Sequence, residues 1–362
     1  MLNKDVTSRV IRAGFLLVTG FLSSAGAAGP LERDSRYRVI AYVYGQRADI
    51  CRINAAKLTH INYAFAKVSE DGEVVFEHPD APAHLALLRT LKSKNPRLKL
   101  LLSVGGWGAD HFSDAALTEA SRETFAASAV AMLESHEMDG IDLDWEYPGQ
   151  PGPGIKYRSE DRENFTLLLE ALRRRLGDRY LLTIASSAGK YFEHTEMDKI
   201  HVDLDWINIM TYDFAGSWSK TTGHHAGLFP STVDFVEQHL RAGIPPEKLV
   251  VGVAFFGKGW RGVKPEKRGI HQPYESYAGG YSYQTLRHLA GQDGFRRYWD
   301  RKARAPYLWS PLSATFISYD DPKSLRAKAK YVKRNRLGGI MYWEHSHDPD
   351  EILLDVLVRN LK

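Results

Sequence analysis

Eight short runs of apolar, β-favouring residues recur along this 362-residue chain, and helical stretches separate most of them. We predict strands at 38–44, 60–68, 98–104, 139–146, 180–187, 206–212, 249–256 and 339–344. The predicted helices are 79–94, 113–137, 158–176, 193–200, 231–242 with Ser231 as its N-cap, 322–336 and 348–360. Continuous apolar strands that alternate with helices indicate an α/β fold with a parallel sheet. Eight such units favour a closed (β/α)₈ TIM barrel. An open doubly wound sheet is the alternative, and it is disfavoured because no G-x-G-x-x-G follows the first strand.

One interval interrupts this alternation, because residues 260–316 separate the seventh strand from its helix. This is far longer than an ordinary strand-to-helix loop. It holds 11 aromatic residues among 57, about a fifth, against 11% for the whole chain. We predict a small α+β insertion domain at 260–316 that forms a wall of a binding groove, with 28–259 and 317–362 as the barrel. The alternative is a cap that only stabilises the barrel.

The N-terminus has the pattern of a secretory signal peptide, predicted as residues 1–27. Lys4, Arg9 and Arg12 form a basic region, an apolar run covers 13–22, and Ala25-Gly26-Ala27 matches an A-x-A cleavage site. The apolar run is too short to span a membrane comfortably. We therefore expect a secreted, extracellular protein, with the periplasm as a second location. A disordered or membrane-anchored N-terminus is the alternative.

Composition excludes some classes of partner and of covalent chemistry. The formal net charge is +4, and basic clusters at 173–175 and 328–336 are interpreted as solvated helix faces, so no nucleic-acid or membrane partner is expected. Cys51 is the single cysteine, so no intrachain disulfide can form. A monomer is expected.

The segment 139–146, Asp-Gly-Ile-Asp-Leu-Asp-Trp-Glu, places four carboxylates within eight residues. In a strand, Asp142, Asp144 and Glu146 project to one face and the apolar residues between them to the other. Like charges a few Å apart cannot all ionise, so at least one pKa is expected to rise. A neutral carboxylic acid beside ionised ones is suited to general acid catalysis. A solvent-facing acidic edge fits poorly with the intervening apolar residues, and the ligand spacing of an EF-hand calcium loop is absent.

The same segment resembles the DxxDxDxE signature of glycoside hydrolase family 18, the chitinases. Ser103-Val104-Gly105-Gly106 is similar to the family's SxGG motif, Met210-Thr211-Tyr212-Asp213 to its strand-six motif, and Tyr342-Trp343 to its strand-eight tryptophan. The interval after strand seven and Ser318-Tyr319-Asp320-Asp321-Pro322 resemble the subgroup with a chitinase insertion domain. The resemblance covers about residues 36 to 361. It implies a bacterial-type (β/α)₈ barrel that cleaves β-1,4-linked N-acetylglucosamine.

The resemblance also implies roles for individual residues. Glu146 would be the general acid, Asp144 would orient and stabilise the substrate's acetamido group, and Asp142 would share a proton with Asp144. Tyr212 would donate a hydrogen bond to the acetamido oxygen, and Asp139 would support the strand. The implied substrate-binding residues are Tyr42, Phe65, Gly106, Trp107, Asp139, Tyr147, Met210, Asp213, Trp218 and Trp343.

In that family the substrate's own acetamido oxygen attacks the anomeric carbon, and water opens the resulting oxazolinium ion with retention. No cofactor is implied. His345 and His347 near Asp348 could suggest a metal site, but we interpret them as hydrogen-bonded loop residues because neither a two-cysteine set nor H-E-x-x-H accompanies them.

Three functions follow from these observations: a secreted chitinase acting on chitin or chitooligosaccharides, a non-catalytic chitin-binding lectin, and a hydrolase of peptidoglycan or glycoprotein glycans. The glutamate Glu146 argues against the lectin, since such lectins typically lack it. The segment Ala254-Phe255-Phe256-Gly257-Lys258 departs from the Pro-Phe-Tyr-Gly-Arg-like sequence of many relatives. Internal and end-directed cleavage are left open.

Overall fold

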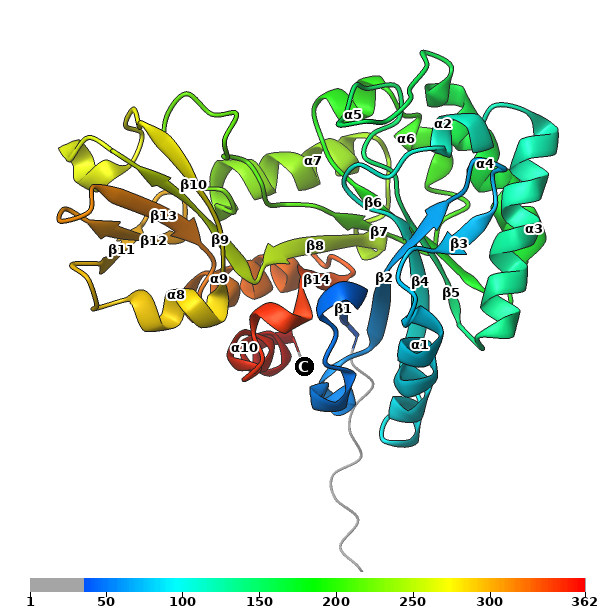
Figure 1. The fold of residues 1–362 in the computed structure, drawn as a ribbon, viewed down its shortest axis with the longest axis horizontal. Coiled ribbons are helices and arrows are strands. Elements are labelled where there is room, and N and C mark those ends of the chain that lie inside the picture. Colours follow the sequence, from blue (N-terminus) through cyan, green and yellow to red (C-terminus); the bar gives the residue numbers. More distant parts are fainter. Residues whose placement is uncertain (1–35, 362) are drawn as a thin grey trace, which may run out of the picture. The chain divides into compact units, whose positions relative to one another are not determined.

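The computed structural model describes residues 36–361, which belong to one compact unit. The predicted signal peptide, 1–27, lies outside the described residues. Eight parallel strands close a barrel because β1 pairs with both β2 and β14 (Figure 1). In the order of the sheet, starting from β1, they are β1 Arg38–Tyr44, β14 Gly339–Trp343, β8 Leu249–Ala254, β7 Trp206–Ile209, β6 Leu181–Ser186, β5 Gly140–Asp144, β4 Lys99–Gly105 and β2 His60–Val68. A short strand, β3 Val74–Phe76, adds antiparallel to β2. The predicted (β/α)₈ barrel is confirmed.

Helices follow most of the barrel strands. They are α1 Ala81–Thr90, α2 Phe112–Ala115, α3 Glu119–Ser135, α4 Asp161–Leu176, α5 Lys190–Glu193, α6 Met197–Ile200, α7 Val233–Arg241, α9 Pro322–Arg334 and α10 Ile352–Leu361. Short 3₁₀ turns lie at Gly45–Arg47, Ile50–Arg52, Ala55–Lys57, Leu91–Ser93, Pro246–Lys248, Glu266–Gly269 and His345–His347.

Three helix predictions were wrong in detail, and local capping explains the first of them. The predicted helix 113–137 is two helices, because the Thr118 side chain accepts a hydrogen bond from Ser121 N and starts α3 with a capping box. The predicted helix 231–242 begins at Val233 with Thr232 as its N-cap, and Ser231 lies inside the one-turn π-helix Leu228–Thr232. The predicted helix 193–200 is the separate α5 and α6.

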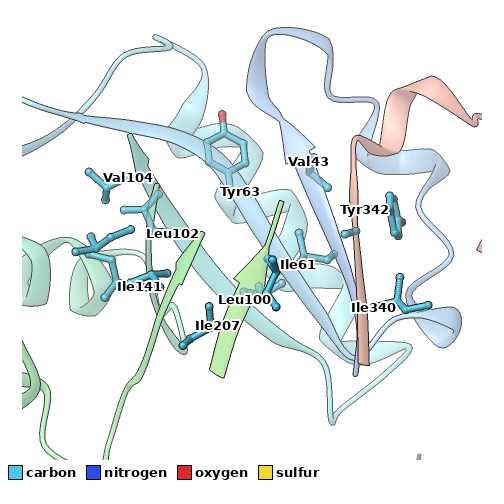
Figure 2. Close-up of a cluster of buried hydrophobic side chains, with 14 of the residues drawn as sticks. Val43, Ile61, Tyr63, Leu100, Leu102, Val104, Ile141, Ile207, Ile340 and Tyr342 are labelled. Atoms are coloured by element: carbon cyan, nitrogen blue, oxygen red, sulfur yellow. The ribbon is translucent and has the colours of Figure 1, made fainter. Parts of the chain in front are cut away.

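The barrel strands bury apolar side chains on both faces. Outward-facing residues such as Val43, Ile61 and Ile141 belong to the large core cluster that also contains residues of the surrounding helices; Figure 2 shows part of it. The barrel interior holds a second cluster that includes Ile40, Leu101, Trp206, Val250 and Met341. Burial on both faces is what a parallel sheet covered by helices requires.

A second sheet of five antiparallel strands lies between β8 and α9 in the sequence (Figure 1). In the order β10-β9-β13-β12-β11, its strands are Ser276–Ser282, Phe256–Arg261, Thr315–Tyr319, Ala305–Ser310 and Arg296–Asp300, and α8 covers Tyr283–Leu289. Four of its aromatic residues, Trp260, Tyr307, Trp309 and Phe316, are buried in a cluster of their own. Many of the aromatic residues of this interval therefore pack in the core of the second sheet. The sheet begins and ends a few residues beyond 260–316, and its role as a separate domain stays a prediction.

A buried ion pair joins this sheet to the barrel. Nζ of Lys328 on α9 lies 2.5 Å from Oδ2 of Asp320, and both side chains are fully buried. Asp320 also accepts hydrogen bonds from Ser324 Oγ at 2.7 Å and from the backbone N of Ala254, the last residue of β8, at 3.3 Å. One carboxylate thus links the ends of β8 and β13 to the first turns of α9.

Candidate active site

Strand β5 carries the acidic residues to the carboxyl end of the barrel. Asp142 and Asp144 are buried, and β5 pairs in parallel with β4 and β6. The strand ends at Asp144, two residues earlier than predicted. Trp145 then packs outward on Phe112, with ring centroids 5.3 Å apart, and Glu146 follows half-buried. The predicted alternation of inward-facing acids and outward-facing apolar side chains thus continues past the end of the strand. The carboxyl ends of barrel strands gather at one face, where this fold builds its sites.

Asp142 is held by four donors at the centre of the barrel. Its Oδ2 accepts from Tyr42 and Ser103, each at 2.8 Å, and its Oδ1 accepts from Thr183 at 2.6 Å and from Asn208 at 3.1 Å. Burial raises the pKa of Asp142, and these hydrogen bonds oppose that rise. A carboxylate offers about four lone-pair sites, so this one is saturated. No hydrogen bond joins Asp142 to Asp144 among the described residues, so the proposed proton sharing requires one of them to change partners.

Asp144 has free accepting capacity. Its side chain is buried and its Oδ1 has no hydrogen-bond partner among the described residues. Burial raises the pKa of Asp144 well above its ordinary value, and the charges of Glu146 and Asp142 raise it further. A buried carboxyl oxygen without a partner is costly. Asp144 can therefore gain stabilisation from a donor or a positive charge that a bound molecule presents.

Glu146 is poised to hold a proton near neutral pH. Burial raises the pKa of Glu146 to about 7, and the charge of Asp213 acts in the same direction. A hydrogen bond with Tyr147 and the charge of Lys67 lower it. Repulsion among the acids of this row predicts a raised pKa, whereas burial is the largest cause of the rise at Glu146. A carboxyl group with such a pKa is suited to general acid and base catalysis.

Asp213 stays ionised beside this acid. Its Oδ1 lies 2.7 Å from Lys258 Nζ and 3.7 Å from Nδ1 of the buried His225. Burial alone would raise the pKa of Asp213, but His225 and the ammonium of Lys258 outweigh it and lower that pKa. Lys258 Nζ also lies 4.6 Å from the centroid of the Trp218 ring. Asp213 therefore adds a fixed negative charge to the site.

Aromatic rings line the mouth of the barrel. The half-buried Trp343 stacks on Phe65 with centroids 5.6 Å apart, and it also contacts Tyr42 and Tyr44 at 5.9 and 5.8 Å. Trp107 and Trp218 are each 64% exposed. Exposed tryptophan rings offer apolar faces on which sugar rings can stack.

Two of the residues predicted to bind substrate are placed elsewhere. Asp139 lies before the first residue of β5, at the amino end of the barrel, where it pairs with Lys92 at 2.6 Å and accepts from the backbone N of Leu100. Asp139 therefore supports the start of the strand and lies at the opposite end of the barrel from the site. Tyr42 is only 2% exposed and donates to Asp142, so it lies beneath the mouth and not along a groove.

The other predicted residues are at the carboxyl end of the strands. Tyr147 is half-buried and edge-on to Trp107 at 6.3 Å. Met210 and Tyr212 are half-buried against the interior cluster, and burial and Asp144 raise the pKa of Tyr212, so its hydroxyl stays protonated. Gly106 has φ +87°, and a Cβ there would lie 2.6 Å from the Phe65 ring.

Sequence reasoning missed several residues of the site. Thr183 and Asn208 are polar residues inside apolar strands, and that pattern could have marked them as partners of a buried acid. Tyr44 follows Tyr42 at the spacing of one strand face. Lys67 and His225 carry no local signal, because only the closed barrel brings them to the acids.

Within residues 36–361, no group of three or more His, Cys, Asp and Glu side chains is placed to hold a metal ion. His345 Nδ1 bonds the hydroxyl of Tyr342 at 2.9 Å, and His347 Nε2 lies 3.2 Å from Glu344 Oε1. None of the helices in that part of the chain combines the length and apolar character needed to cross a membrane.

Comparison with known proteins identifies the family. Residues 38–348 match the family Glycosyl hydrolases family 18. Chitinase A1 of Niallia circulans is 36% identical over 91% of this chain and 59% of its own length, and chitinase B of Serratia marcescens is 31% identical over 83% and 75%. Among solved structures, an N-acetylglucosaminidase of the same family from Paenibacillus barengoltzii superposes with a TM-score of 0.83 at 41% identity, covering 90% of this chain and 99% of its own.

The chain spans less than two thirds of the length of some of these relatives. It covers 59% of chitinase A1 and 32% of the multi-modular chitinase ChiW of Paenibacillus sp. str. FPU-7, whose TM-score is 0.84. The match over 311 of 362 residues (38 to 348), the closed barrel and the row of acids on β5 agree, and the chain therefore belongs to family 18 of the glycosyl hydrolases.

Proposed function

We propose that this protein is a chitinase that hydrolyses β-1,4 linkages between N-acetylglucosamine units by a retaining, substrate-assisted mechanism. The observation that carries the proposal is Glu146, a carboxyl at the mouth of the barrel whose pKa is raised to about 7. Asp144 beside it has an oxygen without a hydrogen-bond partner among residues 36–361, and Trp343 offers a ring to a bound sugar. These three residues supply an acid, an acceptor and an apolar face for the proposed reaction.

In the proposed reaction, each of these residues and Tyr212 has a role. Glu146 donates its proton to the glycosidic oxygen, while the substrate's acetamido oxygen attacks the anomeric carbon and the bond to the leaving sugar breaks. Asp144 accepts the acetamido N–H and stabilises the positive charge of the oxazolinium ion. The Tyr212 hydroxyl donates to the acetamido oxygen. Glu146, now ionised, removes a proton from water, which opens the ring with retention.

The relatives support this substrate class without fixing the mode of cleavage. Besides the two bacterial chitinases, mouse chitotriosidase-1 is 33% identical over 91% of this chain, and a class V chitinase from Nicotiana tobaccum was solved in complex with NAG4. The Paenibacillus barengoltzii relative is an N-acetylglucosaminidase, and another relative at 26% identity is a chitinase-like agglutinin from Robinia pseudoacacia. The products therefore have to be measured.

The test compares acetylated and deacetylated substrates. Chitin oligomers of defined length should be cleaved with retention, while fully deacetylated oligomers should not, because they lack the nucleophile. A thiazoline mimic of the oxazolinium ion should inhibit tightly, since it resembles the intermediate. Ready hydrolysis of the deacetylated polymer would exclude this mechanism, binding without cleavage would favour a lectin, and cleavage of peptidoglycan alone would favour the wall hydrolase. The lengths of the products separate internal from end-directed cleavage.

The proposal extends to export, assembly and the binding groove. The protein is exported after removal of residues 1–27 and acts as a monomer without a cofactor. The sheet predicted as the insertion domain forms a wall of the substrate groove. Lys258 on β9, which holds Asp213, supports the last of these. Mass spectrometry of the mature N-terminus tests the first.

A further inference from the structure

We propose that Lys67 is a positioning residue of this site: it fastens the Gly105–Gly106 turn beside Asp144 and sets a positive charge next to Asp144 and Glu146. This inference rests on the proposed function, because it concerns how that function's acid is controlled. Lys67 is not among the residues that the sequence motifs marked, and it acts through the carboxyls without contacting the reacting atoms.

The geometry around Lys67 starts at the end of β2. The pairing of β2 with β4 shifts register between Ala64 and Ala66, and bulges of this kind redirect the side chains that follow. Just past this shift, Lys67 Nζ donates to the carbonyl oxygen of Gly105 at 3.0 Å. Its side chain is 25% exposed and its Nζ lies 5.6 Å from the centroid of the Phe65 ring. The ammonium is therefore at the mouth of the barrel, beside the ring that stacks on Trp343.

The turn that Lys67 holds lies directly against the acidic strand. Gly106 N donates to the carbonyl oxygen of Asp144 at 2.8 Å. A Cβ on Gly105 would lie 2.1 Å from that same oxygen, so the turn has no room to move closer. Lys67 thus connects the end of β2 through the Gly105–Gly106 turn to the peptide of Asp144.

The charged groups around Glu146 come from four elements of the fold. Lys67 lies on β2, Asp144 lies on β5, and Asp213 follows β7. Lys258 of β9 and His225 in turn contact Asp213. The hydroxyls of Tyr147, Tyr191 and Tyr212 also surround the acids and stay protonated.

These charges act in opposite directions. Lys67 lowers the pKa of both Asp144 and Glu146, whereas Asp213 raises that of Glu146. Glu77 lies 3.6 Å from Lys67 Nζ. Because Glu77 is exposed to solvent, its charge only partly offsets the positive charge of Lys67. Lys67 therefore keeps Asp144 easier to ionise and limits how tightly Glu146 holds its proton.

The experiment separates the charge of Lys67 from its hydrogen bond. Lys67→Gln keeps a donor for the Gly105 carbonyl without the charge, Lys67→Met removes both, and Lys67→Arg keeps both. In the full chain, the pH profiles of kcat and kcat/KM on a chitin oligomer should shift upward by about half to one pH unit in Lys67→Gln and Lys67→Met. Loss of the cation raises the pKa of Asp144, so the acidic limb of the profile moves to higher pH. It also raises the pKa of Glu146, so the alkaline limb moves to higher pH. Lys67→Arg should keep the wild-type profile.

The control is Lys92→Met, which removes a lysine of similar exposure that pairs with Asp139 at the other end of the barrel, and it should shift neither limb. A lower kcat in Lys67→Met at every pH, with both limbs unmoved, would mean that the lysine is only structural and would overturn the proposal.

A ¹³C NMR titration of the Glu146 carboxyl, assigned with Glu146→Gln, gives a readout that does not depend on turnover. The pKa of Glu146 should be higher in Lys67→Gln than in wild type, and an equal value would overturn the proposal. If wild type does not cleave chitin oligomers, the proposed function fails, and this titration still decides the role of Lys67.

Discussion

Replacing Glu146 by glutamine removes the proton that the proposed reaction requires and little else. The amide has the shape of the carboxyl group and can still hydrogen-bond to its neighbour Tyr147. The half-buried position of Glu146 accepts a neutral side chain without a charge left unpaired. The substitution therefore tests the chemistry more than the fold.

The expected loss of activity depends on how much of the enzyme carries this proton, which is set by the pKa of about 7. Near neutral pH a substantial share of the molecules therefore carries the proton, and this share falls as the pH rises. General acid catalysis contributes about 10²- to 10⁴-fold, and a weak amide nucleophile needs a well-protonated leaving group. We expect kcat to fall at least about a thousandfold, roughly 4 kcal/mol in the barrier, while oligomer affinity stays within about tenfold.

The assay measures kcat against pH on one chitin oligomer, affinity by calorimetry and folding by circular dichroism. Wild type should lose activity above about pH 7, and this alkaline limb should vanish in Glu146→Gln. Glu70→Gln, at an exposed position outside the site, is the matched control. A Glu146→Gln enzyme that keeps a tenth of the wild-type kcat would show that the acid lies elsewhere.

Three more predictions follow from the described contacts. Asp213→Asn removes a charge that raises the pKa of Glu146, so the alkaline limb should move down by up to about one pH unit; an unmoved limb in the pH profile would contradict this. Lys328→Met leaves Asp320 buried without its cation and should lower the free energy of unfolding by about 3–5 kcal/mol in urea titrations. Adding Asp320→Asn should recover most of that loss, and an equal loss in the double variant would argue against the ion pair as its cause. Gly106→Ala places a Cβ 2.6 Å from an aromatic ring at a φ of +87°, so kcat should fall and KM rise; unchanged kinetics would refute the predicted clash.

The barrel itself could be predicted from the sequence, because its signals are local. Each apolar run of strand length followed by a helical stretch is visible without knowledge of any other part of the chain, and eight of them suffice to predict closure. Strand boundaries were less accurate, since β5 ends at Asp144, its last residue paired with β4, and its pairing with β6 already stops at Leu143. The helix prediction for 113–137 failed because Thr118 forms a capping box whose strength depends on side-chain geometry.

The sequence by itself also determined which acids lie together, since the period of a strand puts Asp142, Asp144 and Glu146 on one side. It could not determine their environment. Tyr42, Ser103, Thr183 and Asn208 come from four other strands, and only closure of the barrel brings their donors to Asp142. The sequence equally could not show that Asp139, three residues before Asp142, is at the opposite end of the barrel from the site.

The protonation of the site was decided by the tertiary structure alone. The pKa of Glu146 depends first on burial, and burial depends on every element packed around the mouth. Lys67 lies well over a hundred residues before Asp213 and Lys258 in the chain, yet these residues together set the charge on this acid and on its partner Asp144. Strand periodicity acts between neighbouring residues and can be read from the sequence. Desolvation and Coulomb interactions act through space, so they are fixed only when the barrel closes.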